Sequence, residues 1–405
     1  MKKYLLSLLI ILAAASLLSA QELEINGLLG SHQALGVEKG DFHELRETLN
    51  LKLEYWGEQG NLHVSPYFNI DPLTAAGEWS ELGVREMYID LIGNFLDLRI
   101  GKQAVFWGQA EGAFITDVVS PQNLSSFILA DFEEIRIGIP AVKATAYFGP
   151  FTVETLWIQK FIPTILPGTD SPWRTELMPD LSGDLSGVIL PEANLENSEV
   201  FARASYFGSL MTVEIMGGYS WNDLPVAEGV PMNPDLVYHR SVITGGNIST
   251  TVGPVGVRAE GAVTLNKPYS SFQPEISPVL VTENHHLIQG LIGLDGTLYD
   301  FNFSVQYILN YINNYNPALV NQKEILHTAT LRIQRKFLDD RLTASFLSYL
   351  GFDPLDSLIR PEVSFWIEDG LKVSAGADIF LGEPEGKFGI YEGKSQITAS
   401  LQWYF

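Results

Sequence analysis

Residues 396–405 alternate strictly between two kinds of side chain, and this pattern constrains the fold more than any other part of the chain. Ile397, Ala399, Leu401, Trp403 and Phe405 share one parity, and Gln, Thr, Ser, Gln and Tyr occupy the other. A β-strand directs successive side chains to opposite faces. The segment is therefore predicted to be a strand with one apolar face and one mainly polar face.

The segment also ends on an aromatic residue. An alternating strand that closes on phenylalanine resembles the C-terminal strand of bacterial outer-membrane β-barrels. The resemblance implies that the barrel-assembly machinery reads this strand, with Leu401, Trp403 and Phe405 as the assembly signal. The alternative interpretation is an edge strand of a soluble β-sandwich.

The opposite end has the pattern of a secretory signal peptide. Lys2 and Lys3 precede an apolar run from Tyr4 to Leu18, and Ala20 is the expected cleavage position. The run is too short, and too soon followed by polar residues, to favour a spanning helix. We expect residues 1–20 to be removed, which takes two lysines away and leaves residues 21–405 as a single exported barrel domain.

Composition agrees with a membrane barrel and excludes several classes. Hydrophobic residues make up 46% of the chain, yet no later stretch provides about 18 consecutive apolar residues, as a spanning helix requires. The formal net charge of −23 argues against nucleic acid as a partner, because nucleic-acid binding needs clustered Lys and Arg. The chain has no cysteine, which excludes disulfides, thiolate metal sites and a lipoprotein anchor.

Short and long connections alternate along the chain. Eight short turn signals lie at residues 57–60, 93–94, 149–150, 208–209, 253–254, 295–296, 339–340 and 369–370. Nine longer polar stretches lie at about residues 31–45, 71–83, 108–139, 162–196, 222–236, 265–281, 312–322, 352–357 and 383–395. Seventeen connections join 18 strands, with 16 as the alternative count, and an even number places both termini on the periplasmic side. The predicted fold class is all-β, a transmembrane antiparallel up-and-down β-barrel.

The polar faces of the strands would line the interior of such a barrel. The charged residues inferred to face the lumen are Lys52, Glu86, Asp90, Asp97, Arg99, Lys143, Arg258 and Lys372. Pro66 and Pro361 interrupt two strand patterns, and we expect a bulge or a strand end at each because proline cannot donate to a ladder.

The densest group of charged and aromatic residues lies in the third long loop, 108–139. Its length of 32 residues exceeds that of an ordinary connection, and its apolar residues would not remain in water. We expect the loop to fold inward and narrow the pore, as the third loop of general porins does; the alternative is an extracellular cap. The candidate constriction residues are Glu111, Asp117, Asp131, Glu133, Glu134 and Arg136, with Arg99, Lys143, Glu86 and Asp90 on the wall.

The region around this loop also resembles a known family. Arg85-Glu86, Tyr88 and Asp90 are followed by Arg99 and Gly101, and then by Trp107-Gly108. This run is similar to a family of uncharacterised porin-like outer-membrane proteins of Gram-negative bacteria. The family usually has Asn-Pro and then Asp further on, where this chain has Ser120-Pro121 and Asn123. The resemblance implies a barrel and does not indicate a transported compound.

Catalytic and metal-binding motifs are missing from the sequence. None of the seven histidines lies in a nucleophile motif, and neither His-x-x-x-His nor Gly-x-Ser-x-Gly occurs. His285 and His286 are adjacent, so on a strand they point to opposite faces. We therefore expect no enzyme activity, no metal and no cofactor.

Two function classes follow from these observations. The first is an outer-membrane porin-like channel for passive or weakly selective passage of small solutes, with a mild cation preference. The second is a barrel that acts as a surface scaffold or adhesin through its loops, or as a channel for a specific apolar or aromatic solute. The expected partners are outer-membrane lipid, the barrel-assembly machinery and small solutes, with the protein as a monomer or a homo-oligomer such as a trimer.

Overall fold

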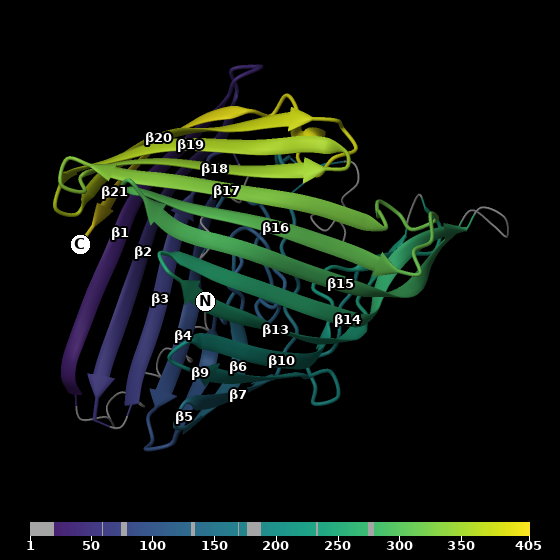
Figure 1. The fold of residues 1–405 in the computed structure, drawn as a ribbon, viewed down its shortest axis with the longest axis horizontal. Helices are drawn as coiled ribbons and strands as arrows, with labels where there is room; N and C mark the ends of the chain where they lie inside the picture. The colour runs from purple at the N-terminus through teal and green to yellow at the C-terminus, as the bar shows by residue number, and fades with distance from the viewer. Residues whose placement is uncertain are drawn as a thin grey trace.

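The computed structural model describes residues 20–58, 60–73, 79–130, 134–168, 170–175, 188–231, 234–273 and 279–405. Within these ranges the regular elements are β-strands and one 3₁₀ helix, and no helix is long and apolar enough to cross a membrane. Eighteen strands form one closed antiparallel β-barrel (Figure 1). The predicted fold class and the count of 18 strands are therefore confirmed.

Each barrel strand pairs with the barrel strands before and after it in the chain, and β21 pairs with β1 to close the sheet. The strands are β1 (Ala20–Gly36), β2 (Phe42–Gly57), β3 (Gly60–Ile70), β4 (Ser80–Leu91), β5 (Leu96–Gln103), β6 (Ile139–Phe148), β7 (Phe151–Ile158), β9 (Glu199–Phe207), β10 (Met211–Trp221), β13 (Arg240–Val252), β14 (Val255–Gln273), β15 (Val279–Leu298), β16 (Phe301–Asn313), β17 (Ile325–Phe337), β18 (Leu342–Phe352), β19 (Leu355–Glu368), β20 (Leu371–Gly382) and β21 (Gln396–Tyr404). Closure leaves no sheet edge exposed.

Three short strands and the 3₁₀ helix lie in the long connections. Strands β8 (Val188–Ile189), β11 (Val226–Glu228) and β12 (Asp235–Val237) form a separate sheet, and helix η2 (Gly389–Tyr391) precedes β21. These elements belong to the connections after β7, β10 and β20, so they cover the end of the barrel that carries the long loops.

The two faces of the barrel wall differ as the alternation predicts. In β10, Ile215 is 64% exposed on the outward face, whereas its neighbour Met216 is 6% exposed on the inward face. The last strand likewise presents Ile397, Leu401 and Trp403 outward, each about half exposed. A soluble sandwich would bury these residues in a core, so the outward apolar surface distinguishes the barrel from the sandwich.

One predicted turn is misplaced. Asp295 and Gly296 lie inside β15, where they pair with Gly256 and Val255 of β14. The hairpin instead turns at Tyr299 and Asp300, whose φ angles are 48° and 66°. The prediction was wrong because Asp-Gly is a common hairpin signal, whereas the left-handed conformation at Tyr299 and Asp300 depends on the pairing of the flanking strands.

Several predicted loops are shorter than expected because the strands extend beyond the alternating core. The connections predicted at 31–45 and 265–281 are residues 37–41 and 274–278, since β1, β2, β14 and β15 are 17, 16, 19 and 20 residues long. The stretch predicted as a long loop at 352–357 is only a two-residue link, Asp353-Pro354, between β18 and β19.

The predictions made for the two strand prolines have different outcomes. The ladder between β3 and β4 shifts register between Val64 and Pro66, as expected for a bulge. Pro361 pairs with Phe346 in an unshifted ladder, and the β19–β20 register is the same on either side of it. The bulge or strand end predicted at Pro361 is therefore wrong, because a proline fits a ladder position that donates no hydrogen bond.

Candidate pore and the segment that lines it

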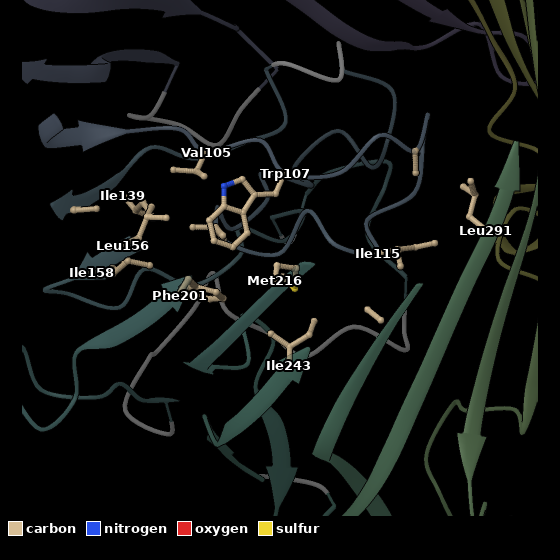
Figure 2. Close-up of a cluster of buried hydrophobic side chains, with 14 of the residues drawn as sticks. Val105, Trp107, Ile115, Ile139, Leu156, Ile158, Phe201, Met216, Ile243 and Leu291 are labelled. Atoms are coloured by element: carbon tan, nitrogen blue, oxygen red, sulfur yellow. The ribbon is translucent and has the colours of Figure 1, made fainter. Parts of the chain in front are cut away.

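The connection between β5 and β6, residues 104–138, contacts the inward face of the wall. Its buried residues Val105, Trp107, Ala110, Ile115 and Val119 pack in one apolar cluster. The wall residues of that cluster are Ile139, Ala141, Leu156, Ile158, Phe201, Met216, Ile243, Ala262, Leu291 and Ile308, from strands β6 to β16 (Figure 2). The segment covers an apolar patch of the interior that would otherwise face water.

Trp107 is the largest side chain in this cluster. It is 2% exposed, and its ring lies edge-on to Phe201 of β9 with 6.1 Å between the centroids. Its indole Nε1–H donates to the Glu154 carboxylate of β7 at 3.4 Å, and the Arg203 guanidinium lies 5.2 Å from the ring centroid. Trp107 thus fixes the start of the segment against the wall through both packing and a polar contact.

Polar side chains of the wall satisfy the backbone of the segment. The Glu260 carboxylate of β14 accepts hydrogen bonds from the N–H groups of Gln109 and Thr116 and from the Thr116 hydroxyl. The Gln306 side chain of β16 accepts from the N–H of Glu111 and donates to its carbonyl. These bonds pair main-chain groups that an irregular segment would otherwise leave unsatisfied.

A buried ion pair connects the two halves of the segment. The Arg136 guanidinium donates to the Asp117 carboxylate, and both side chains are 2% exposed. Asp117 also accepts from the N–H of Trp107 at 3.1 Å, and Arg136 lies 4.4 Å from the ring centroid of Phe106. Burial lowers the pKa of Arg136 to about 10, so the guanidinium remains protonated at neutral pH and the pair remains ionic.

The bulge beside Pro66 directs two consecutive residues of β4 toward the segment. The Glu86 carboxylate accepts from the N–H of Ala104 at 2.7 Å, where the segment begins. The Arg85 guanidinium lies 3.2 Å from the Glu134 carboxylate, near the end of the segment. Consecutive strand residues normally point to opposite faces, so the bulge explains how both reach the interior.

The other wall residues predicted for the constriction form ion pairs along the strands. Arg99 of β5 donates two hydrogen bonds to Asp90 of β4, at 2.7 and 2.9 Å. Lys143 of β6 lies 4.0 Å from Glu154, which also pairs with Arg203. These charges neutralise one another at the wall.

A polar cavity of about 220 Å³ lies between the segment and the opposite part of the wall. Strands β1 to β4 and β19 to β21 supply the wall side, and residues 126, 129, 130 and 134 supply the segment side. Its charged and titratable lining residues are His32, Glu44, Arg46, Arg85, Glu134, Arg360, Glu362, Lys372 and Asp378. The formal charges of the four acidic and four basic residues cancel, and His32 is counted as neutral.

The residues predicted for the constriction therefore separate into several places. Glu134 lines the cavity, whereas Glu111 contacts Arg332 and Gln306, and Asp117 and Arg136 are buried in their mutual ion pair. Asp131 and Glu133 lie outside the described residues. The segment was predicted at residues 108–139. In the structure it comprises residues 104–138, because β5 ends at Gln103 and β6 starts at Ile139.

Of the charged or titratable cavity residues, sequence reasoning selected only Glu134 as a site residue. The eight others are His32, Glu44, Arg46, Arg85, Arg360, Glu362, Lys372 and Asp378, of which Lys372 was assigned to the lumen face and Arg85 belonged only to the family resemblance. Alternation shows which residues of one strand share a face, but it could not indicate which part of the lumen the segment leaves open.

Three connections meet in a second buried cluster. Phe127 of the β5–β6 segment, Trp173 of the β7–β9 connection and Tyr391 of η2 pack together against Tyr349, Leu358, Phe380 and Phe388. The Tyr391 hydroxyl donates to the carbonyl of Trp173 at 3.2 Å, and Arg360 donates to the carbonyl of Leu129 at 2.9 Å. The cluster fixes the segment from the loop side of the barrel.

Solved structures share this architecture at low sequence identity. OpdK of Pseudomonas aeruginosa, solved with vanillate, aligns with a TM-score of 0.56 and 10% identity over 95% of this chain and 99% of its own. OccK5 (OpdH) of the same organism has the same TM-score and identity, over 95% and 98%. OccAB4 of Acinetobacter baumannii has a TM-score of 0.59 and 9% identity, over 96% and 99%. The likeness shows a common fold.

The sequence itself matches one family model. No curated protein matches the chain. The model described as "Protein of unknown function (DUF1302)" matches residues 80–365, which is more than half of the chain. This range contains β4 and β5, the wall-lining segment and the strands that it contacts up to β18. The chain therefore belongs to the DUF1302 family.

Proposed function

We propose that this protein is an outer-membrane channel for the passive passage of small polar solutes. The observation that carries the proposal is a polar cavity inside a closed barrel whose outward face is apolar. Barrels satisfy all their strand hydrogen bonds and can therefore cross a bilayer. A polar interior supplies water-filled space for solutes.

Export and assembly are part of the same proposal. Residues 1–19 lie outside the described residues, and we propose that residues 1–20 act as the signal peptide and are removed. The outward apolar band would contact lipid, and the C-terminal strand would engage the barrel-assembly machinery. The protein would work as a monomer or a homo-oligomer, without catalytic activity, cofactor or metal.

The segment 104–138 would act as the constriction. It occupies the side of the interior next to β6–β16 and leaves the polar cavity beside β1–β4 and β19–β21. Its hydrogen bonds with Glu260 and Gln306, and the burial of its own Trp107, support a fixed position. A fixed constriction sets an upper limit on the size of the solute.

A mild cation preference is proposed for the channel as a whole. The acidic and basic residues of the cavity balance, although the chain has 48 acidic and 25 basic residues. Most of the acidic excess therefore lies elsewhere, including the turn residues Asp339, Asp340 and Asp369. Such charges enrich cations near the mouths over a distance of about 8–10 Å at moderate salt, so the preference would weaken as salt increases.

The polar lining favours polar solutes over apolar ones. OpdK was solved with vanillate, an observation on that protein. In the cavity described here, Ser31, Ser126, Ser374 and Ser400 accompany the charged residues, and Tyr404 is the aromatic lining residue. This composition supports hydrophilic solutes as the main class.

The direct test is conductance of the purified, refolded protein in planar lipid bilayers. We expect stable single-channel steps, and swelling of liposomes in small sugars that slows as the sugar becomes larger. The control is the same protein after heat denaturation, which should give neither signal. A folded, membrane-inserted barrel that carries no current and admits no sugar would contradict the channel and favour a scaffold that acts through its loops.

A further inference from the structure

Two charged residues that line the polar cavity have no partner among the described residues. Glu362 of β19 and Lys372 of β20 take part in no side-chain hydrogen bond or ion pair. The other charged or titratable lining residues all have partners: His32 and Arg46 contact Glu44, Arg85 contacts Glu134, and Arg360 contacts Asp378. The cavity thus has one unpaired negative group and one unpaired positive group.

The two unpaired groups lie on the same face of adjacent strands. Glu362 pairs with Gly376, Ser364 with Ser374, and Trp366 with Lys372. Alternate residues of a strand share a face, so Glu362, Ser364 and Trp366 point inward together with Ser374 and Lys372. Position 366, which lies opposite Lys372, is four steps along β19 from position 362, or about 13 Å at 3.3 Å per residue. The Ser374 hydroxyl lines the cavity between the two charges.

Neighbouring charges cannot replace the missing partners. The backbone positions of Glu362 and Lys372 lie about 13 Å apart along the strands, which exceeds a Debye length at physiological salt, and no ion pair joins the two side chains among the described residues. Arg360, two residues from Glu362, already pairs with Asp378 at 2.7 Å. Glu368 lies opposite Leu371, next to Lys372, and no ion pair between Glu368 and Lys372 is present among the described residues. Both groups are therefore free to bind a solute.

We propose that Glu362 and Lys372 bind a zwitterionic solute, a short peptide of two or three residues, extended along β19 and β20. This inference rests on the proposed channel function. The ammonium of the peptide would donate to Glu362, and its carboxylate would accept from Lys372. An extended peptide of this length spans about 7–11 Å. One hydrogen bond of about 3 Å at each end brings this to about 13 Å for two residues and about 17 Å for three. The first value equals the spacing of the two positions along the strands, and the flexible Lys372 stem can accommodate the second.

A solute with both charges gains two contacts, whereas a solute with one charge gains only one. Each contact is a partly hydrated ion pair, of the kind that changes an equilibrium by about two- to fivefold. Dwell time in the cavity should therefore increase by about that factor for each of the two charges. The binding is weak enough to permit release, as transport requires.

The test uses three peptides of equal length on single channels in planar bilayers. Triglycine carries both charges, N-acetyltriglycine only the negative one, and triglycinamide only the positive one. We expect triglycine to interrupt the current for about two- to fivefold longer than either analogue. Glu362→Gln should reduce the dwell time of triglycine to that of N-acetyltriglycine, and Lys372→Gln to that of triglycinamide. Lys323→Gln, in the β16–β17 loop and outside the cavity lining, is the matched control and should change nothing.

A charge swap gives a second and independent measurement. The double variant Glu362→Lys with Lys372→Glu retains both charges but exchanges their positions. Triglycine should therefore bind in the opposite direction, with its carboxylate at position 362, and keep its long dwell time. Either substitution alone should lose it. Heat-modifiable mobility in gels verifies assembly of each variant, and the two single Gln variants test the proposal independently of the swap.

The outcomes separate this inference from the channel function. A wild-type protein that conducts ions but treats the three peptides alike overturns the zwitterion site and leaves the channel intact. Unchanged dwell times in both Gln variants also overturn it. A wild-type protein that inserts and carries no current overturns the channel function itself, and the site with it.

Discussion

Gly27 of β1 and Phe405 at the end of the chain hydrogen-bond to each other in both directions. The N–H of Gly27 donates to the carbonyl of Phe405 at 2.7 Å, and the N–H of Phe405 donates to the carbonyl of Gly27 at 3.0 Å. A Cβ on residue 27 would lie 2.2 Å from the Phe405 ring. The absence of a side chain at Gly27 therefore allows the ring to lie over β1 where the barrel closes.

The first prediction concerns this closure. Gly27→Ala should displace the Phe405 ring, and Phe405→Ala should remove it, so both variants should lower the yield of assembled barrel. Gly256→Ala is the matched control, because a Cβ there meets no atom closer than 3.7 Å. The measurement is the heat-modifiable fraction in the membrane. Full yields for both closure variants would show that the contact is dispensable.

The second prediction compares the two faces of the wall at one depth. Val363 is 49% exposed on the outward face. Ser374 lines the cavity on the inward face, and it lies at nearly the same depth because its neighbour Ala375 pairs with Val363. Val363→Arg places a charge in lipid and should lower the free energy of unfolding by about 2–4 kcal/mol near the midplane. Ser374→Arg places the charge in water and should cost much less. Denaturant unfolding in lipid or detergent checks the order, and equal costs would mean that the faces are misassigned.

The third prediction concerns the buried ion pair of the segment. Asp117→Asn removes the carboxylate that pairs with the buried Arg136 guanidinium, which should cost about 3–5 kcal/mol locally. We expect noisier single-channel current and a lower melting temperature. Adding Arg136→Met should restore part of the loss, because it also removes the buried positive charge.

The control for that prediction is an exposed pair. Lys336 and Asp340 lie 3.8 Å apart with side chains 51% and 74% exposed. Asp340→Asn should therefore change stability by less than about 1 kcal/mol. If Asp117→Asn behaves like this control, the pair does not hold the segment.

The fourth prediction concerns ion preference. Glu134→Gln leaves the Arg85 guanidinium unpaired beside the cavity, so the reversal potential in a salt gradient should shift toward anions. Arg85→Gln should shift it toward cations. Glu111→Gln, outside the cavity lining, should have a smaller effect. Replacing Asp131, Glu133 and Glu134 together with neutral amides should shift the potential further toward anions, because three negative charges are removed from the segment.

The fifth prediction tests the constriction. Deleting residues 112–130 removes Ile115, Val119 and Phe127 from the two buried clusters and should enlarge single-channel conductance. Assembly is checked by heat-modifiable mobility. A correctly assembled deletion variant with unchanged conductance and selectivity would place the segment away from the permeation path.

Local patterns in the sequence were sufficient to predict the barrel fold. Whether Ile397, Leu401 and Trp403 share a face depends only on their spacing along one strand, because successive side chains alternate. Turn residues such as Gly149-Pro150 and Gly253-Pro254 likewise act on their own hairpins. The strand number, its even parity and the outward apolar face follow from such local features.

The tertiary structure alone decided how the charges are combined. Arg85 and Glu86 reach the interior together because they form a bulge opposite the single residue Ser65 of β3, and Asp117 is neutralised by Arg136, 19 residues further along the chain. Glu362 and Lys372 border the open cavity because the segment fills the other side of the barrel. Register, bulges and loop packing depend on contacts between residues far apart in the chain, and alternation along one strand contains no information about them.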